Sequence, residues 1–150
     1  MTDDRKVTTD EYSPKLFRPH GRVEFSVLED NILVCEAVGP FNLELITAVV
    51  FVQSPLIDDL IKQEKWGDIV VFKESALASP QVLSSFTEYL RSLSTSMRMP
   101  TATALVIPAE VEGSTIMTQQ YQICYDDAGL NAVVFDDFDK ALAWISTRVK

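Results

Sequence analysis

The order of the predicted elements constrains this chain more than any other feature of its sequence. Two short strand patterns come first, and helix and strand patterns then alternate to the last residue. Strands are indicated by apolar side chains at every second position or in short continuous runs, and helices by apolar side chains every three or four residues. The resulting order, ββαβαβαβα, predicts one α/β domain with a mixed sheet of about five strands and helices packed against it.

The first two strands are expected to form an antiparallel hairpin. Residues 23–27 alternate apolar and polar side chains, residues 29–31 have turn chemistry, and residues 32–38 are apolar again. The later strands are joined through helices, so we expect them to be mostly parallel, with right-handed crossovers. They are predicted at residues 68–72, 103–107 and 132–135.

Helix ends are indicated by side chains that can accept a hydrogen bond from an exposed backbone N–H. The candidate caps are Asn42, Ser79, Ser114 or Thr115, and Asp136 or Asp137. Pro55 lacks an N–H and predicts a kink or break in the first helix. Gly129 has the position of a helix stop in the left-handed conformation.

The chain of 150 residues is expected to divide into an N-terminal arm, residues 1–21, and a domain over residues 22–150. The arm has little apolar pattern and is predicted to be mobile or strapped across the domain. In strand 32–38, Ile32, Val34 and Val38 lie on the face opposite Leu33 and Cys35, so both faces need cover. Leu16 and Phe17 of the arm, or a second copy of the chain, would supply it, and we favour a homodimer.

Composition excludes some classes of partner. The formal net charge is −9, from 13 basic and 22 acidic residues, which argues against a nucleic-acid binder. No apolar stretch is long enough to predict a membrane span. Cys35 and Cys124 are isolated, and the polar first residues do not resemble a secretory signal. We therefore expect a cytoplasmic protein.

The full order of elements resembles the STAS/SpoIIAA-like superfamily, and more closely its small stand-alone bacterial proteins of undefined activity. The resemblance covers about residues 21–150 and rests on the hairpin that ends at Gly39-Pro40, the strand 68–72, and the closing VVFDDFDKALAWI. It implies a mixed sheet with helices packed against it. Distant relatives include the lipid-binding Sec14-type domains.

The resemblance also raises one modification site. Anti-sigma-factor antagonists of the superfamily have a serine switch at a helix start after the central strand, in an Asp-Ser-Ser-Gly-like motif. In the matching stretch, residues 73–80, Ser79 has a comparable cap position, but the Asp-Ser pair and the glycine are missing. A phosphate at Ser79 would meet free N–H groups, whereas a plain N-cap explains the serine equally and is preferred.

A ligand or partner site is expected at the carboxyl ends of the strands, where α/β proteins bind their ligands. The candidate residues of this rim are Lys73, Glu74, Ser75, Ser79, Ser114, Asp136 and Asp137. Neither a metal site nor a cofactor is predicted, because the five glycines form no phosphate-binding loop and the aspartates have no calcium-loop spacing. His20 is the one histidine, and no serine or cysteine nucleophile motif accompanies it, so a catalytic triad is not predicted.

Three functions are compatible with these patterns. The preferred hypothesis is a non-enzymatic cytoplasmic protein-binding or regulatory module, because no catalytic constellation is visible and the family pattern fits. A carrier of an apolar small molecule or lipid is the alternative, favoured by the strongly apolar stretch 43–52 and by the Sec14 relationship. A small enzyme that uses Lys73 and Glu74 for acid–base chemistry ranks third.

Overall fold

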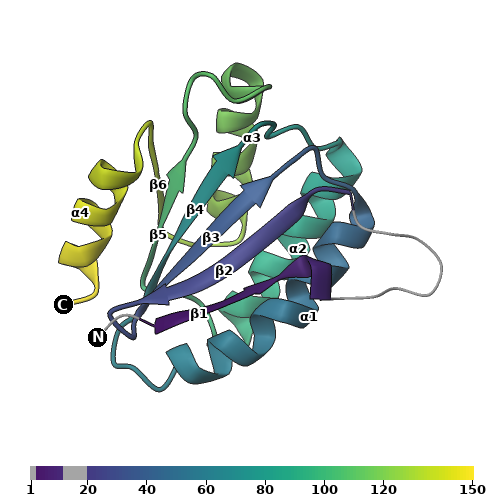
Figure 1. The fold of residues 1–150 in the computed structure, drawn as a ribbon. Coiled ribbons are helices and arrows are strands. Elements are labelled where there is room, and N and C mark those ends of the chain that lie inside the picture. The colour runs from purple at the N-terminus through teal and green to yellow at the C-terminus, as the bar shows by residue number, and fades with distance from the viewer. Residues whose placement is uncertain (1–2, 12–19) are drawn as a thin grey trace.

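The computed structural model describes residues 3–11 and 20–150, and side chains from Lys6 onward. Within this part the chain forms a mixed six-stranded sheet with helices on both faces (Figure 1). The strands are β1 (Asp3–Thr8), β2 (Arg22–Leu28), β3 (Ile32–Val38), β4 (Gly67–Lys73), β5 (Ala102–Val106) and β6 (Ala132–Phe135). The helices are the short 3-10 helix η1 (Thr9–Glu11) and α1 (Leu43–Leu60), α2 (Pro80–Thr95), α3 (Ser114–Asp127) and α4 (Phe138–Arg148).

The strands lie in the sheet in their chain order, from β1 to β6. The hairpin of β2 and β3 is antiparallel, as predicted, and β3, β4, β5 and β6 run parallel. Helices α1, α2 and α3 connect these parallel strands and lie on one face of the sheet, so the three crossovers share one hand (Figure 1). Helix α4 follows the last strand and packs on the other face.

The expected number of strands was wrong by one. β1 falls inside the stretch that we expected to be an arm, and it pairs antiparallel with β2 at the edge of the sheet. Its short, charged sequence gives little of the alternation that indicates a strand. The Thr9 hydroxyl, buried just after β1, accepts a hydrogen bond from Val23 N at 3.0 Å and ties this segment to β2. Leu16 and Phe17 lie outside the described residues.

The sheet separates two apolar layers. The larger layer includes Phe25, Leu33 and Leu105 and packs under α1, α2 and α3. The smaller layer includes Ile69 and packs against Ile145 of α4. Both layers bury side chains almost completely, so each contributes the roughly 1.5–3 kcal/mol per large apolar side chain that burial provides.

The second face of β3 is covered within the chain over part of its length. Ile32 and Val34 are 2% and 7% exposed and belong to the same layer as Ile145 and Val149 of α4. Their cover therefore does not require a second copy, and the homodimer stays a prediction without this support. Val38, at the end of the strand, is half-buried.

Most predicted helix ends are found at the expected residues. Asn42, Ser79 and Asp137 cap α1, α2 and α4 through their side chains, and Gly129 is left-handed with φ 75°. Helix α3 differs, because Gly113 is its N-cap and no side chain accepts a bond there. Of the kink or break predicted at Pro55, the break does not occur: α1 continues through this residue to Leu60, since burial of Ile57 and Leu60 holds the second half in place.

Candidate functional site

A cavity of about 90 Å³ lies inside the larger apolar layer, between the sheet and helices α1 and α2. The strands supply one side of it through Val23, Phe25, Cys35, Ala37, Asp68, Val70 and Phe72. The helices and the loop before them supply the other side through Phe41, Leu45, Ile46, Val49, Gln53, Val82, Leu83, Phe86, Tyr89, Leu90, Leu93, Tyr121 and Tyr125. Asp68 and Phe72 are four residues apart on β4, so the part of this strand that lines the cavity is roughly 13 Å long at about 3.3 Å per residue.

The cavity reaches solvent between α1 and α2. Val70 belongs to a strand that is covered on both faces, yet it is only half-buried, whereas its register partners Cys35 and Leu105 are buried. Ile46 on α1 and Phe86 on α2 also line the cavity and are half-buried. A small molecule therefore has a route to the interior that does not cross the sheet.

A carboxyl group lies at one end of this apolar space. Asp68 is 7% exposed and lines the cavity, and its carboxylate accepts a hydrogen bond from the hydroxyl of Thr103, its register partner on β5. Burial raises the pKa of Asp68 to about 7, and the hydrogen bond from Thr103 opposes that rise. Within residues 3–11 and 20–150 no Lys, Arg or His lines the cavity, so this carboxyl has no basic partner there.

Neutral polar groups lie near the carboxyl. The Tyr89 hydroxyl donates a 2.5 Å hydrogen bond to Gln53 Oε1, and Gln53 Nε2 faces Cys35 Sγ at 4.0 Å. Sulfur is a weak acceptor, so the buried amide of Gln53 is held by one strong bond. Burial raises the pKa of Cys35, Tyr89 and Tyr125, and Asp68 adds to the rise in each case, so these groups are neutral at physiological pH.

Aromatic rings form a continuous series along the wall. Phe72 and Tyr121 stack with ring centroids 4.6 Å apart, and Phe86 contacts the rings of both Tyr121 and Tyr125 edge-on, at 6.3 and 5.8 Å. Phe41 meets Phe72 edge-on at 6.1 Å. Such pairs fix ring orientation, and the π faces they leave carry partial negative charge.

At the rim predicted from the sequence, the loops after β4 and β5 are joined to each other and do not form the two sides of an open crevice. The loops after β4 and β5 are joined by backbone hydrogen bonds: Ala76 N donates to Glu112 O and Glu112 N donates to Glu74 O, both at 2.9 Å. Ser75 is buried, and its hydroxyl accepts from Leu77 N. These two predicted loops therefore do lie side by side, but their contact fills the space between them.

The other rim residues have local structural contacts. Ser79 caps α2, and the Ser114 hydroxyl donates to Ala109 O at 3.0 Å. Asp137 caps α4, and Asp136 forms an ion pair with Lys140 of the same helix at 3.1 Å. The structure does not test whether this rim binds a partner, so it stays a prediction.

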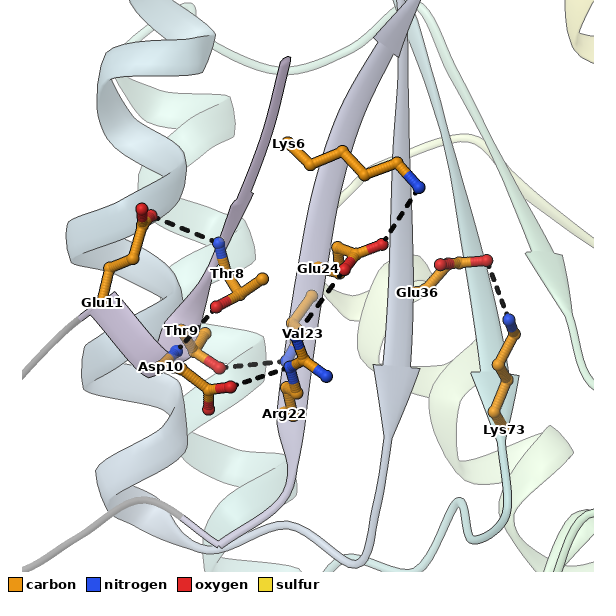
Figure 2. A network of polar contacts seen from close by, with 10 residues as sticks. All are labelled: Lys6, Thr8, Thr9, Asp10, Glu11, Arg22, Val23, Glu24, Glu36 and Lys73. Carbon is orange, nitrogen blue, oxygen red and sulfur yellow. Dashed lines mark hydrogen bonds and ion pairs between the residues drawn. The ribbon is translucent and has the colours of Figure 1, made fainter. Parts of the chain in front are cut away.

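Lys73 belongs to a surface network rather than to the cavity. Figure 2 shows it beside Glu36, whose carboxylate it contacts at 2.9 Å, on the face of the sheet opposite α1 and α2. The hydrogen bond from Lys73 lowers the pKa of Glu36. The network continues over β2 and β1 through Glu24 and Lys6, which are 3.5 Å apart. Paired charges of this kind, at partly exposed side chains, describe a solvated sheet face.

Among the described residues no three His, Cys, Asp or Glu side chains are grouped so that they could hold a metal ion. In the same part of the chain no helix is both long and apolar enough to cross a membrane.

Sequence reasoning missed Asp68 and Gln53. Asp68 was read as the first residue of a buried apolar strand, and its side chain points into the layer under α1 and α2. A charged residue at the start of such a strand was the available signal. Gln53 gave a second signal, since it is a polar residue that follows the apolar stretch of the first helix.

Compared with known proteins, the chain matches no protein-family model, no curated protein and no solved structure. The resemblance to the SpoIIAA-like proteins therefore stays a prediction, and the α/β fold with its mixed sheet rests on the structure.

Proposed function

We propose that this chain is a small-molecule-binding module that holds a largely apolar ligand between its sheet and helices α1 and α2. The observation that carries the proposal is the cavity itself, about 90 Å³ in volume and lined mainly by aliphatic and aromatic side chains. Well-packed interiors have few voids larger than a water molecule, so a space of this size needs an explanation. Ligand sites are commonly apolar concavities with a few convergent polar groups.

The proposal corresponds to the carrier hypothesis raised by the sequence and names the cavity as the proposed binding place. The size of the cavity limits the part of the ligand that is enclosed. An engineered cavity of about 150 Å³ binds benzene, so this one suits a smaller body, such as a four-carbon chain. A larger ligand would have to extend outward past the half-buried Ile46 and Phe86.

A neutral probe tests this proposal. Addition of millimolar 1-butanol to ¹⁵N-labelled protein should shift the NMR signals of the Val70 amide and the Gln53 side chain in a saturable way. Val70→Phe places a larger side chain in the cavity and should abolish the shifts, whereas Val133→Phe, on exposed β6, should retain them. Absence of saturable shifts in the wild type, or equal shifts in Val70→Phe, contradicts the proposal.

The protein-binding or regulatory hypothesis stays a prediction, as does the cytoplasmic location. The Lys73–Ser79 rim would be its surface, and affinity capture from the source cell would test it. A protein that co-purifies with the wild type but not with a rim variant such as Glu74→Lys would support it. Loss of capture in Val70→Phe instead would link the partner to the cavity.

A further inference from the structure

We propose that the ligand of this cavity carries a protonated amine, which binds the Asp68 carboxylate while its apolar part lies among the aromatic rings. This inference rests on the proposed function and names the chemical class of its ligand. It follows from three features of the cavity: the sign of its one charged group, the composition of its wall, and the lack of any counter-ion within it.

The charge in the cavity has one sign. Asp68 is the single carboxyl among the lining residues, and the thiol and phenol groups there have a raised pKa, which keeps them neutral. Thr103 gives its carboxylate one neutral hydrogen bond, and the described residues supply no cation to it. Arg98, whose charge acts on the cavity-lining Tyr89, is already 2.8 Å from the carboxylate of Asp58. An anionic ligand would therefore meet a like charge in a poorly solvated space, which is strongly unfavourable.

An ammonium group relieves the unfavourable burial of this carboxyl. The folded chain already keeps Asp68 away from water, since its side chain is buried beneath α1 and α2 with 7% of the residue exposed. A cation beside it restores a favourable interaction that folding removed, and charge-assisted hydrogen bonds are about twice as strong as neutral ones. Folding has therefore already removed water from the carboxylate before the ligand binds. The ion pair has to offset only the removal of water from the amine.

The aromatic wall favours the same charge. Tyr89 and Tyr125 line the cavity together with Asp68, and the electrostatic effect of Asp68 on both tyrosines places them near its carboxyl. Phe86 and Tyr121 continue the wall away from it. Cations are attracted to aromatic faces, and recognition of organic ammonium groups by aromatic cages uses this effect.

The shape of the cavity selects the apolar part. Its lining follows β4 from Asp68, which supplies the carboxyl, through Val70 to Phe72, which belongs to the series of aromatic rings. A linear alkylamine with its nitrogen at Asp68 would place its chain between Val49 of α1 and Leu90 of α2, both of which are buried. The proposed ligand is therefore a small primary alkylamine, or the amine end of a longer apolar molecule.

Three probes of equal length test the proposal: n-butylamine, 1-butanol and butanoate, titrated into the wild type at pH 8 and followed by NMR shifts of Val70 and Gln53. We expect the amine to bind roughly tenfold more tightly than the alcohol, which corresponds to about 1.4 kcal/mol, and butanoate not to bind. In Asp68→Asn, which keeps an acceptor for Thr103, the amine should lose that advantage. Asp127→Asn removes an exposed charge outside the cavity and should leave all three affinities unchanged.

The outcomes separate the two proposals. If the alcohol or butanoate binds as tightly as the amine, the ligand class is wrong and the binding module stands. If none of the three binds, both proposals are overturned. Should Asp68→Asn fail to fold, the wild type still decides: affinity for the amine must rise between pH 5 and pH 8 as Asp68 ionises, whereas affinity for the alcohol must not. Cys35, Tyr89 and Tyr125, which face Asp68 from β3, α2 and α3, stay neutral over this range.

Discussion

Thr103 on β5 donates its hydroxyl to the carboxylate of Asp68 on β4, and the two residues are register partners across the parallel strands. This pair is the polar end of an otherwise apolar cavity. A hydroxyl satisfies one acceptor position but cannot neutralise the charge, so the carboxyl remains a group that is unfavourable to ionise in the folded chain.

The first prediction concerns the dependence of stability on pH. Burial raises the pKa of Asp68 from 3.8 to about 7, so between these values the folded state holds a proton that the unfolded state has released. The free energy of unfolding contributed by this group is therefore highest below about pH 4 and falls until about pH 7. That interval corresponds to at most roughly 4 kcal/mol, at 1.36 kcal/mol per pH unit.

Urea denaturation of the wild type and of Asp68→Asn at several pH values measures this contribution. The variant has no such proton. The free energy of unfolding of Asp68→Asn minus that of the wild type should therefore increase from pH 4 to pH 8, and at pH 8 the variant should be the more stable protein. Other titrating groups cancel in the difference between the two proteins. A difference that does not change with pH would mean that Asp68 ionises freely in the folded state.

A second prediction concerns the packing of α4 on the sheet. A β-carbon at Gly67 would lie 2.9 Å from Cγ1 of Ile145 and 3.0 Å from Cγ1 of Val149, so Gly67→Ala must displace α4. We expect a loss of roughly 1–3 kcal/mol in the free energy of unfolding. Ile145→Ala alone should cost about 2–5 kcal/mol, because this side chain is fully buried.

The double variant tests whether the two residues meet. Because Ile145→Ala removes the atoms that a methyl at Gly67 would strike, the double variant should be more stable than the sum of the single losses by about 0.5–3 kcal/mol. Phe25→Ala, on the opposite face of the sheet, provides the control and should add to Gly67→Ala without coupling. Equal coupling in both pairs would contradict the described position of α4.

A third prediction concerns Ser79. Its hydroxyl accepts a 3.3 Å hydrogen bond from Val82 N at the start of α2, so Ser79→Ala should lower the free energy of unfolding by about 1 kcal/mol. Ser84→Ala, at an exposed position inside the same helix, should change it by less than about 0.5 kcal/mol. If Ser79 is also a phosphosite, incubation with kinases of the source cell adds a phosphate mass that Ser79→Ala lacks; otherwise the cap is its whole role.

A fourth prediction concerns the surface network on the open sheet face. The hydrogen bond from Lys73 lowers the pKa of Glu36, so Lys73→Met should raise that pKa in a carboxyl NMR titration. Stability should change by less than about 1 kcal/mol, because both side chains are partly exposed. Lys62→Met, which breaks an exposed pair with Asp59, should leave the pKa of Glu36 unchanged.

The sequence was sufficient for the hairpin, the parallel strands and three of the four α-helix caps, because these depend on local alternation and on side chains next to the backbone they bind. It was insufficient for β1, whose pairing with β2 is a long-range contact of a charged segment. It was also insufficient for the continuity of α1, since packing of Ile57 and Leu60 outweighs the local effect of Pro55.

The candidate site was predicted less well than the fold. Asp68, Gln53 and Tyr89 come from a strand and two different helices, and only the packing of α1 and α2 on the sheet brings them together. The loops after β4 and β5 are close in space, since the backbones of Glu74 and Glu112 are hydrogen-bonded, and Ser75, Ser79 and Ser114 use their side chains in local structural contacts. A cavity results from imperfect packing of side chains in three dimensions. The spacing of residues along the sequence does not indicate where such a space will lie.

The most direct measurement of the central claim is an isotope-filtered NOE experiment on labelled protein with unlabelled n-butylamine. Binding inside the cavity predicts NOEs from the butyl protons to the Val70 methyl groups and the Phe86 ring, which line it from the sheet and from α2. The same NOEs should disappear in Val70→Phe. NOEs confined to exposed apolar side chains such as Met97 or Ile116, or no intermolecular NOEs at millimolar probe, would contradict the account.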